Sequence, residues 1–224
     1  MKILQSHQIL SDFLISKKQS GRPLIVGISG MGGCGKTVLA SIVGAALKRS
    51  GYSVCIILLD DFHNPRQQRY ARGEISPEGY YHDAYNFGAL SACALKLLHE
   101  APTFPVRCQT KNFDLARDQE HLQFQEVDGD TIVFVEGTFV FRPELSPFLH
   151  VKVFMKAEYG TILSRVMIRD TELLGTAERV REQYEQRYIP AHKLYLAHVH
   201  PEGISDVVID NDNLDSPQVH FHRD

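Results

Sequence analysis

The sequence contains no tryptophan, only four cysteines and a small net charge of −3. The cysteines are scattered without a C-x-x-C pair, so they indicate reduced thiols rather than a disulfide framework or a zinc site. No apolar run reaches the roughly 18 residues of a membrane span, and the polar N-terminal segment is unlike a signal peptide. The weak charge gives no electrostatic footprint for nucleic acid or an anionic membrane. We therefore expect a cytoplasmic protein that binds neither nucleic acid nor membrane.

Length and composition fit one globular α/β domain. With 224 residues and 43% hydrophobic content, the chain is long enough to bury a sizeable core. We expect a single domain over residues 1–224, with an N-terminal helix in 1–20, a lid at about 160–190 and a tail over 211–224. The tail is mostly polar, so we expect it to fray.

What the sequence does contain is a complete G-x-x-x-x-G-K-[ST] motif. Its residues are Gly30, Met31, Gly32, Gly33, Cys34, Gly35, Lys36 and Thr37. The apolar run 24–28 before the motif predicts a buried strand, and the apolar residues after it recur at helical spacing. A phosphate-binding loop forms between a strand and a helix, so the motif has the surroundings that its mechanism requires.

The chemistry of this loop follows from its residue types. The glycines and the small Cys34 allow several backbone N–H groups to converge on one anion. Lys36 would supply a positive charge to the β- and γ-phosphates of a bound nucleotide, and the Thr37 hydroxyl would ligate Mg²⁺. The alternative is a glycine-rich turn that ends in an ordinary surface lysine. The flanking strand and helix favour nucleotide binding.

Two further apolar runs end in acidic residues. Residues 53–59 predict a strand followed by Asp60, and residues 131–135 predict another followed by Glu136. Ligands of open parallel sheets bind beyond the carboxyl ends of the strands, so Asp60 and the adjacent Asp61 should lie near the γ-phosphate. The alternation of strands with helical segments predicts an α/β fold with a doubly wound parallel sheet.

Four segments lie between or after these strands. Residues 64–85 have no clear period and predict a long functional loop. Residues 102–130 carry apolar residues among charges and predict a small β excursion beside the site. Residues 159–170 and 177–199 have helical spacing, so we expect two helices there.

Seven segments carry a resemblance that is more specific than the phosphate loop alone. They are G-I-S-G-M-G-G-C-G-K-T, L-D-D-F-H, Y-H-D-A-Y-N-F, F-V-E-G-T-F-V-F, S-R-V-M-I-R-D, Q-Y-E-Q-R-Y-I-P-A-H and S-D-V-V-I-D. In this order they resemble the uridine kinase and phosphoribulokinase family of P-loop kinases. The resemblance covers about residues 24–210. It implies a P-loop NTPase fold with a small helical lid, ATP and Mg²⁺ as cofactors, and in many members a homo-oligomer.

The resemblance implies that Asp60 is the catalytic base. Asp60 stands at the first position of the family's D-S-F-Y type of motif, where a carboxylate orients the acceptor hydroxyl and takes its proton. The alternative role for Asp60 is a turn or helix N-cap, and the alternative base is Asp61. Lys36 would act beside it on the transferred phosphoryl group.

The same resemblance assigns a metal-binding residue and a phosphate clamp. Glu136 matches the family's E-G motif and would hold Mg²⁺ through its water shell; the alternative is a strand-end charge that faces solvent. Arg165 and Arg169, four residues apart on a helix, match lid arginines that stabilise the transferring charge. A solvated basic face is their alternative. Family members often carry further arginines where this chain has Ile162 and Val166, so the clamp is thinner here.

Two residues are carried over to the acceptor itself. Asp83 matches the Asp of the family's P-D-A-F stretch, which binds the hydroxyls of a ribose-like acceptor. Its alternative role is a helix N-cap just before Ala84. Gln183 matches the family's Q-Y pair and is placed at the substrate.

The segment around Phe113 departs from the family. Uridine kinases carry Tyr-Asp-Phe here, followed a few residues later by a base-reading His. This chain carries neither that tyrosine nor that histidine, so an ordinary uridine or cytidine pocket is not implied. We place Phe113 and Arg117 at the acceptor. Arg107, Lys111 and Arg117 could read an anionic or differently shaped acceptor.

Two functions follow as hypotheses. The first is an ATP- and Mg²⁺-dependent kinase that phosphorylates a hydroxyl of a nucleoside or related ribose-type acceptor. The second is a nucleotide-binding regulatory or switch protein that needs no acceptor pocket. The segments that contain Asp83, Phe113 and Gln183 favour the kinase, because a switch has no use for them.

Overall fold

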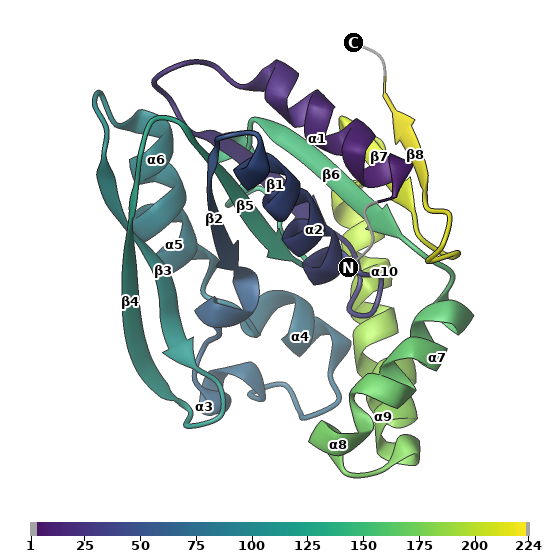
Figure 1. Ribbon diagram of the computed structural model, residues 1–224. Coiled ribbons are helices and arrows are strands. Elements are labelled where there is room, and N and C mark those ends of the chain that lie inside the picture. The colour runs from purple at the N-terminus through teal and green to yellow at the C-terminus, as the bar shows by residue number, and fades with distance from the viewer. Residues whose placement is uncertain (1–3, 223–224) are drawn as a thin grey trace.

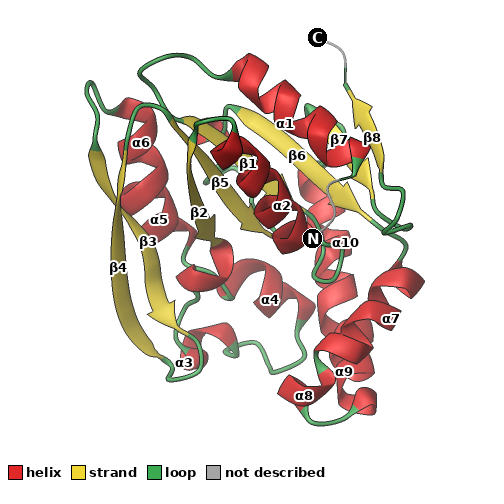
Figure 2. Ribbon diagram, in the orientation of Figure 1, coloured by secondary structure: helices red, strands yellow, loops and turns green. Residues whose placement is uncertain are grey.

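The computed structural model describes residues 4–222, which fold around one six-stranded sheet (Figure 1 and Figure 2). The strand order is β2-β5-β1-β6-β7-β8, in which the first five strands are parallel and β8 is antiparallel to β7. The predicted α/β fold with a parallel sheet is therefore confirmed. The strands are β1 (Leu24–Ser29), β2 (Ser53–Leu58), β5 (Thr131–Gly137), β6 (Val151–Lys156), β7 (Val207–Asp210) and β8 (Gln218–Phe221).

Helices cover both faces of the sheet, and this explains why its central strands are almost entirely apolar. In β1, Ile25 packs into one hydrophobic core and Val26 into the other, because successive side chains point to opposite faces. One face is covered by α1 (Gln5–Lys17) and α2 (Lys36–Arg49). The opposite core includes residues of α4 (Pro77–Asp83), α5 (Phe87–Leu90), α6 (Lys96–Glu100) and α10 (Ile189–Val199).

Two excursions flank the carboxyl edge of the sheet. Figure 1 shows the β3–β4 hairpin on one side of this edge and helices α7 to α9 on the other. The hairpin, β3 (Val106–Asp114) and β4 (Gln119–Val127), confirms the β excursion predicted for residues 102–130. The helices are α7 (Tyr159–Arg169), α8 (Thr171–Leu174) and α9 (Ala177–Gln183), and a π-helical turn (Tyr184–Tyr188) joins α9 to α10.

Two expectations need correction. Residues 64–85 are not a plain loop, because they contain α3 (Arg66–Arg69) and α4. The tail over residues 211–224 does not fray throughout, because Gln218–Phe221 forms β8 and extends the sheet beside β7. The Phe221 ring packs on Phe13 of α1, at 4.9 Å between ring centroids. Phe13 is far from Phe221 in the sequence, so the polar composition of the tail alone could not predict this contact.

In the part of the chain that the structure describes, no helix combines the length and the apolar character that a membrane span requires.

Candidate active site

Three parallel strands bring the predicted site residues to one edge of the sheet. β5 lies between β2 and β1, and its Glu136 is opposite Leu58 of β2 and Ile28 of β1. The phosphate loop follows β1, and Asp60 follows β2. Since the carboxyl ends of parallel strands share one edge, the loop, Glu136 and Asp60 converge there.

The phosphate loop is packed so tightly that two of its glycines have no room for a side chain. Gly30 has φ +151°, and a Cβ there would lie 2.2 Å from the Met155 carbonyl oxygen. Gly33 has φ +88°, and its Cβ would lie 2.6 Å from Val166 of α7. Non-glycine residues rarely adopt the backbone conformation at Gly33. Both glycines are therefore required by the contacts of the loop with β6 and α7.

The loop is also tied to the end of β7. The side-chain amide of Asn211 donates a hydrogen bond to the Cys34 carbonyl at 2.8 Å. Cys34 itself is fully buried, and this burial raises the pKa of its thiol. The thiol thus serves as a small neutral side chain beneath the loop.

Thr37, Glu136 and Lys36 form a polar cluster at the mouth of the loop. The Thr37 hydroxyl donates to Glu136 Oε1 at 2.9 Å, while Glu136 Oε2 is buried and has no hydrogen-bond partner among the described residues. Lys36 is buried, and its ammonium donates to the Met31 carbonyl at 3.1 Å. A hydroxyl beside a carboxylate with an unused oxygen is the donor set that Mg²⁺ prefers. Thr37 and Glu136 therefore fit the metal expected for a P-loop kinase.

The charges around Glu136 show that the cluster extends to Asp60 and Arg169. Burial raises the pKa of the Glu136 carboxyl, and the charge of Asp60 adds to this effect. Lys36, the Thr37 hydrogen bond and Arg169 act in the opposite direction. A cation at the free oxygen would stabilise the ionised carboxylate, because opposite charges at short range favour the charged form.

Asp60 lies at the tip of β2 in a 3-10 turn, and two aromatic residues hold it. The Tyr85 hydroxyl donates to Asp60 Oδ1 at 3.0 Å, and the His63 ring nitrogen Nδ1 lies 2.7 Å from the Asp60 carbonyl oxygen. Burial, with the Asp60 charge, raises the pKa of Tyr85 well above its ordinary value, so its hydroxyl stays protonated. The N-cap of this turn is Leu58, so helix capping does not use the Asp60 carboxylate.

Two neighbours extend this arrangement. Tyr80 Oη lies 2.9 Å from Tyr85 Oη, so the tyrosines form a chain that ends at Asp60. Asp61, the alternative base, forms an ion pair with Lys111 at 2.7 Å. Sequence reasoning missed both tyrosines, although both occur in or beside the Y-H-D-A-Y-N-F segment. The role of their hydroxyls becomes apparent only from the hydrogen bonds that link Tyr80 to Tyr85 and Tyr85 to Asp60.

The Asp83 carboxylate is already paired with a basic residue. Asp83 is the last residue of α4, and its Oδ2 accepts a hydrogen bond from Arg72 Nε at 2.7 Å. The next helix is capped by Asn86, whose side chain accepts from the Ala89 amide. The N-cap alternative for Asp83 therefore does not apply, and its carboxylate faces Arg72.

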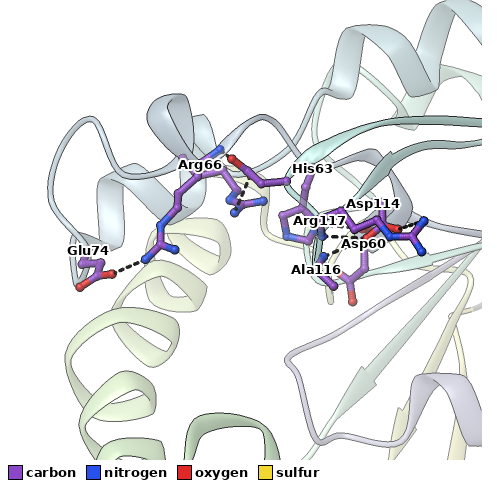
Figure 3. A network of polar contacts seen from close by, with 9 residues as sticks. Asp60, His63, Arg66, Glu74, Asp114, Ala116 and Arg117 are labelled. Carbon is purple, nitrogen blue, oxygen red and sulfur yellow. Dashed lines mark hydrogen bonds and ion pairs between the residues drawn. The ribbon is translucent and has the colours of Figure 1, made fainter.

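Phe113 and Arg117 both belong to the β3–β4 hairpin, in different surroundings. Phe113 is buried, with the Arg69 guanidinium carbon 5.8 Å from its ring centroid. Arg117 is exposed and pairs with Asp114 at 3.8 Å. Figure 3 shows Arg117 at Asp114, while Arg66 reaches away from them to Glu74.

The two predicted lid arginines do not share one role in this conformation. Arg169 pairs with Asp170 at 2.6 Å and donates to the Tyr184 hydroxyl at 3.4 Å. That hydroxyl lies against the phosphate loop, 3.2 Å from where a Cβ of Gly32 would be. Arg165 instead donates to the Asn211 carbonyl, which lies after β7. The structure therefore brings Arg169 to the phosphate loop and Arg165 to the segment that follows β7.

Gln183 lies half-buried at the end of α9, immediately before Tyr184. It is thus next to the residue that contacts Arg169 and the phosphate loop.

An apolar cavity of about 450 Å³ adjoins the phosphate loop. Gly35 and the first turns of α2 line it on one side, and residues at the end of β7 line it on the other. Further lining residues come from the start of α1, including His7. The mostly apolar lining of this cavity is typical of small-molecule sites.

Comparison with known proteins agrees with this geometry. The chain is 26% identical over 199 residues to a uridine kinase of Deinococcus deserti, covering 88% of this chain and 91% of that protein. Its fold is similar to that of a possible uridine kinase from Bacillus stearothermophilus, with a TM-score of 0.71, 24% identity and coverage of 90% and 96% of the two chains. A D-glycerate 3-kinase from Cryptococcus neoformans shares the fold at 14% identity, with a TM-score of 0.68 and coverage of 97% and 100%.

The sequence also matches the description "Phosphoribulokinase / Uridine kinase family" over residues 25–211. This range begins in β1 and ends just after β7, so it includes every strand that delivers a residue to the site. The chain therefore belongs to the phosphoribulokinase / uridine kinase family of P-loop kinases.

Proposed function

We propose that this kinase transfers the γ-phosphoryl group of ATP to a hydroxyl of a small acceptor, either a nucleoside or a related ribose-type compound. The observation that carries the proposal is the position of Asp60. Its carboxylate lies at the strand edge that also holds the phosphate loop and Glu136, and a tyrosine hydroxyl orients it. Curated relatives named uridine kinase support the nucleoside class.

The phosphate end binds the nucleotide. The backbone N–H groups of residues 30–37 surround the phosphates, and Lys36 turns from the Met31 carbonyl to the β- and γ-phosphates. Thr37 and Glu136 would hold Mg²⁺, and the bound ion would supply positive charge that offsets the charge on the phosphate oxygens. The base of ATP lies in the apolar cavity beside Gly35. Helices α7 to α9 act as the lid.

Asp60 acts on the acceptor. Its carboxylate accepts a hydrogen bond from the attacking hydroxyl and takes the proton as the new O–P bond forms and the bond between the γ-phosphorus and the β–γ bridging oxygen breaks. Lys36 and Arg169 offset the charge of the transferred group. Arg165 contributes through its hold on the segment after β7. Asp83, Phe113 and Gln183 contact the remainder of the acceptor, whereas Arg117 is exposed and pairs with Asp114.

The test is an acceptor-dependent ADP assay. Purified protein is incubated with ATP, Mg²⁺ and a panel of nucleosides, pentoses, sugar phosphates and hydroxy acids. We expect ADP release that depends on one class of acceptor and stops when the metal is chelated. ADP release at the same rate without any acceptor would contradict the proposal, and would favour a nucleotide-binding switch protein.

A further inference from the structure

Arg187 is a buried cation without an anionic partner. Arg187 lies in the π-helical turn between α9 and α10, and the residue is only 4% exposed. Its Nε is buried and has no hydrogen-bond partner, and no ion pair joins Arg187 to any other residue within the described range 4–222. Such a guanidinium is costly to bury, because a buried charge normally requires a counter-ion and acceptors for its N–H groups.

Aromatic rings surround this guanidinium. Its central carbon lies 4.7 Å from the ring centroid of Tyr70, 5.2 Å from that of Tyr80 and 5.6 Å from that of Tyr188. These rings attract the cation, but among the described residues no hydrogen bond joins its N–H groups to a tyrosine hydroxyl or to another acceptor. The aromatic contacts therefore position Arg187 without satisfying its hydrogen-bonding capacity.

A second arginine lies beside the same Tyr70 ring. The Arg69 guanidinium carbon is 5.6 Å from the Tyr70 centroid, and Arg69 is 6% exposed. Its Nη2 meets Asp118 at 3.3 Å, while its Nη1 is buried without a partner. Arg66 also lies over this ring, at 5.6 Å, so three guanidinium groups approach it. Arg66 pairs with Glu74 and Arg69 with Asp118, which leaves Arg187 without a carboxylate among the described residues.

Arg187 and Arg69 are close to the predicted base. Tyr80, which Arg187 contacts, is linked through Tyr85 to the Asp60 carboxylate. Burial lowers the pKa of His63, whose ring lies on the Asp60 carbonyl. Asp60 opposes this effect, and the positive charges of Arg69 and Arg187 add to it. An acceptor whose hydroxyl meets Asp60 would therefore extend toward Arg187.

The basic residues that sequence reasoning offered for an anionic acceptor have other partners. Arg107 lies over the Phe124 ring of the hairpin, Lys111 pairs with Asp61, and Arg117 pairs with Asp114 at the surface. Only the tertiary structure shows that the Arg187 guanidinium lacks an acidic partner among the described residues.

We propose that the acceptor carries an oxyanion, a carboxylate or a phosphate, which the Arg187 guanidinium binds while Asp60 receives the hydroxyl. The proposal rests on the proposed kinase function and narrows its acceptor to an anionic ribose-type compound. A planar fork of N–H donors matches the two oxygens of such a group, so Arg187 determines which acceptors bind.

The test is a binding measurement that does not need turnover. The full-length protein is first loaded with Mg²⁺ and adenylyl imidodiphosphate, a non-hydrolysable ATP analogue, so that the phosphate loop is occupied. Calorimetry then compares three probes with related carbon chains: neutral D-ribose, D-ribonate with a carboxylate, and D-ribose 5-phosphate. The variants are Arg187→Met, Arg187→Lys and the matched control Arg181→Met. Arg181 lies on α9, with a side chain that is 51% exposed.

We expect at least one anionic probe to bind the wild type more tightly than ribose, and Arg187→Met to weaken that binding about 100-fold. Arg187→Lys should give an intermediate loss, because it keeps the charge without the fork. Arg181→Met and ribose binding should stay unchanged. Thermal melting checks that each variant is folded, and Arg187→Lys supplies the comparison if Arg187→Met is not. Equal binding of charged and neutral probes, no binding of either anion, or losses shared by Arg181→Met would overturn the proposal.

An ADP-release assay with the same proteins separates this inference from the proposed function. Transfer to ribose or uridine at an undiminished rate in Arg187→Met, with no preference for anions, would overturn the anionic acceptor and leave the kinase function intact. Anion binding that depends on Arg187, without ADP release for any acceptor, would support the anion site and contradict the kinase function.

Discussion

The phosphate end of this site and its proposed acceptor end, around Asp60 and Arg187, are built in different ways. At the phosphate end, backbone groups and short side chains lie on the tips of neighbouring strands, and Thr37 already meets Glu136. At the acceptor end, short helices carry bulky rings and guanidinium groups, and the Arg187 charge meets no carboxylate of the described chain. The first arrangement suits a ligand that all P-loop kinases share. The second suits a ligand particular to this chain.

The sharpest way to separate the two ends is to remove the charge of Asp60. We expect Asp60→Asn to lower kcat about 1000-fold, since general base catalysis contributes about 100- to 10,000-fold. Binding of ATP should be unchanged, because the phosphate end keeps all its groups. Steady-state kinetics and calorimetry measure the two effects. Asp61→Asn is the matched control and should cost less than tenfold, because Asp61 pairs with Lys111 instead. Equal losses in both variants would refute the role of Asp60.

The next largest effect concerns the two arginines of α7. We expect Arg169→Met to lower kcat about 100-fold, as removal of a group that stabilises transferring charge does. Arg165→Met should lower kcat less and mainly weaken ATP binding, because Arg165 holds the segment after β7 that borders the apolar cavity. Comparison of kcat with the KM for ATP distinguishes the two. The opposite ranking would show that the lid closes with Arg165 on the phosphates.

A smaller effect is expected from the hydroxyl that orients Asp60. Tyr85→Phe removes one charge-assisted hydrogen bond and should lower kcat about tenfold, with little change in the KM for ATP. Tyr80→Phe removes a hydroxyl one step further from Asp60 and should have a smaller effect. Activity assays across pH would also show whether the pH dependence of kcat changes in Tyr85→Phe. If kcat is unchanged in both, the tyrosine chain is structural only.

The smallest expected effect concerns the pH dependence of stability and involves His192. Burial lowers the pKa of His192 to about 4, with a contribution from the Lys36 charge, and its Nδ1 lies 3.3 Å from the Tyr159 hydroxyl. In the unfolded chain His192 takes up its proton near pH 6.5, but in the folded protein only near pH 4. The free energy of unfolding that neutral His192 supports is therefore complete above pH 6.5 and decreases as the pH falls toward 4.

His192→Asn should therefore make the free energy of unfolding depend less on pH in this window, by up to about 1 kcal/mol per pH unit. Denaturant titrations at several pH values measure this slope. His220, an exposed histidine of β8, is a suitable control for substitution by asparagine. An unchanged slope in His192→Asn would show that the pKa of His192 is the same in the folded and the unfolded chain, contrary to the expected lowering.

Much of the phosphate end could be predicted because its requirements are local in sequence. A glycine-rich loop between an apolar strand and a helix is recognisable from a few consecutive residues. The carboxyl ends of the strands of a parallel sheet share one edge, so residues that follow different strands can be placed together. The order of the motifs also allowed the family to be predicted. The β8 strand was missed because its pairing partner and Phe13 lie outside its own segment.

The acceptor end illustrates the limit. The sequence by itself determined the fold class, the phosphate loop and the acidic residues at the carboxyl ends of β2 and β5, because each depends on short-range pattern and backbone freedom. Only the tertiary structure decided that Tyr85 reaches Asp60, that Lys111 is paired with Asp61 and that Arg187 is buried among tyrosines. These contacts join segments that are distant in the chain, and the charge left without a partner depends on how all of them pack together.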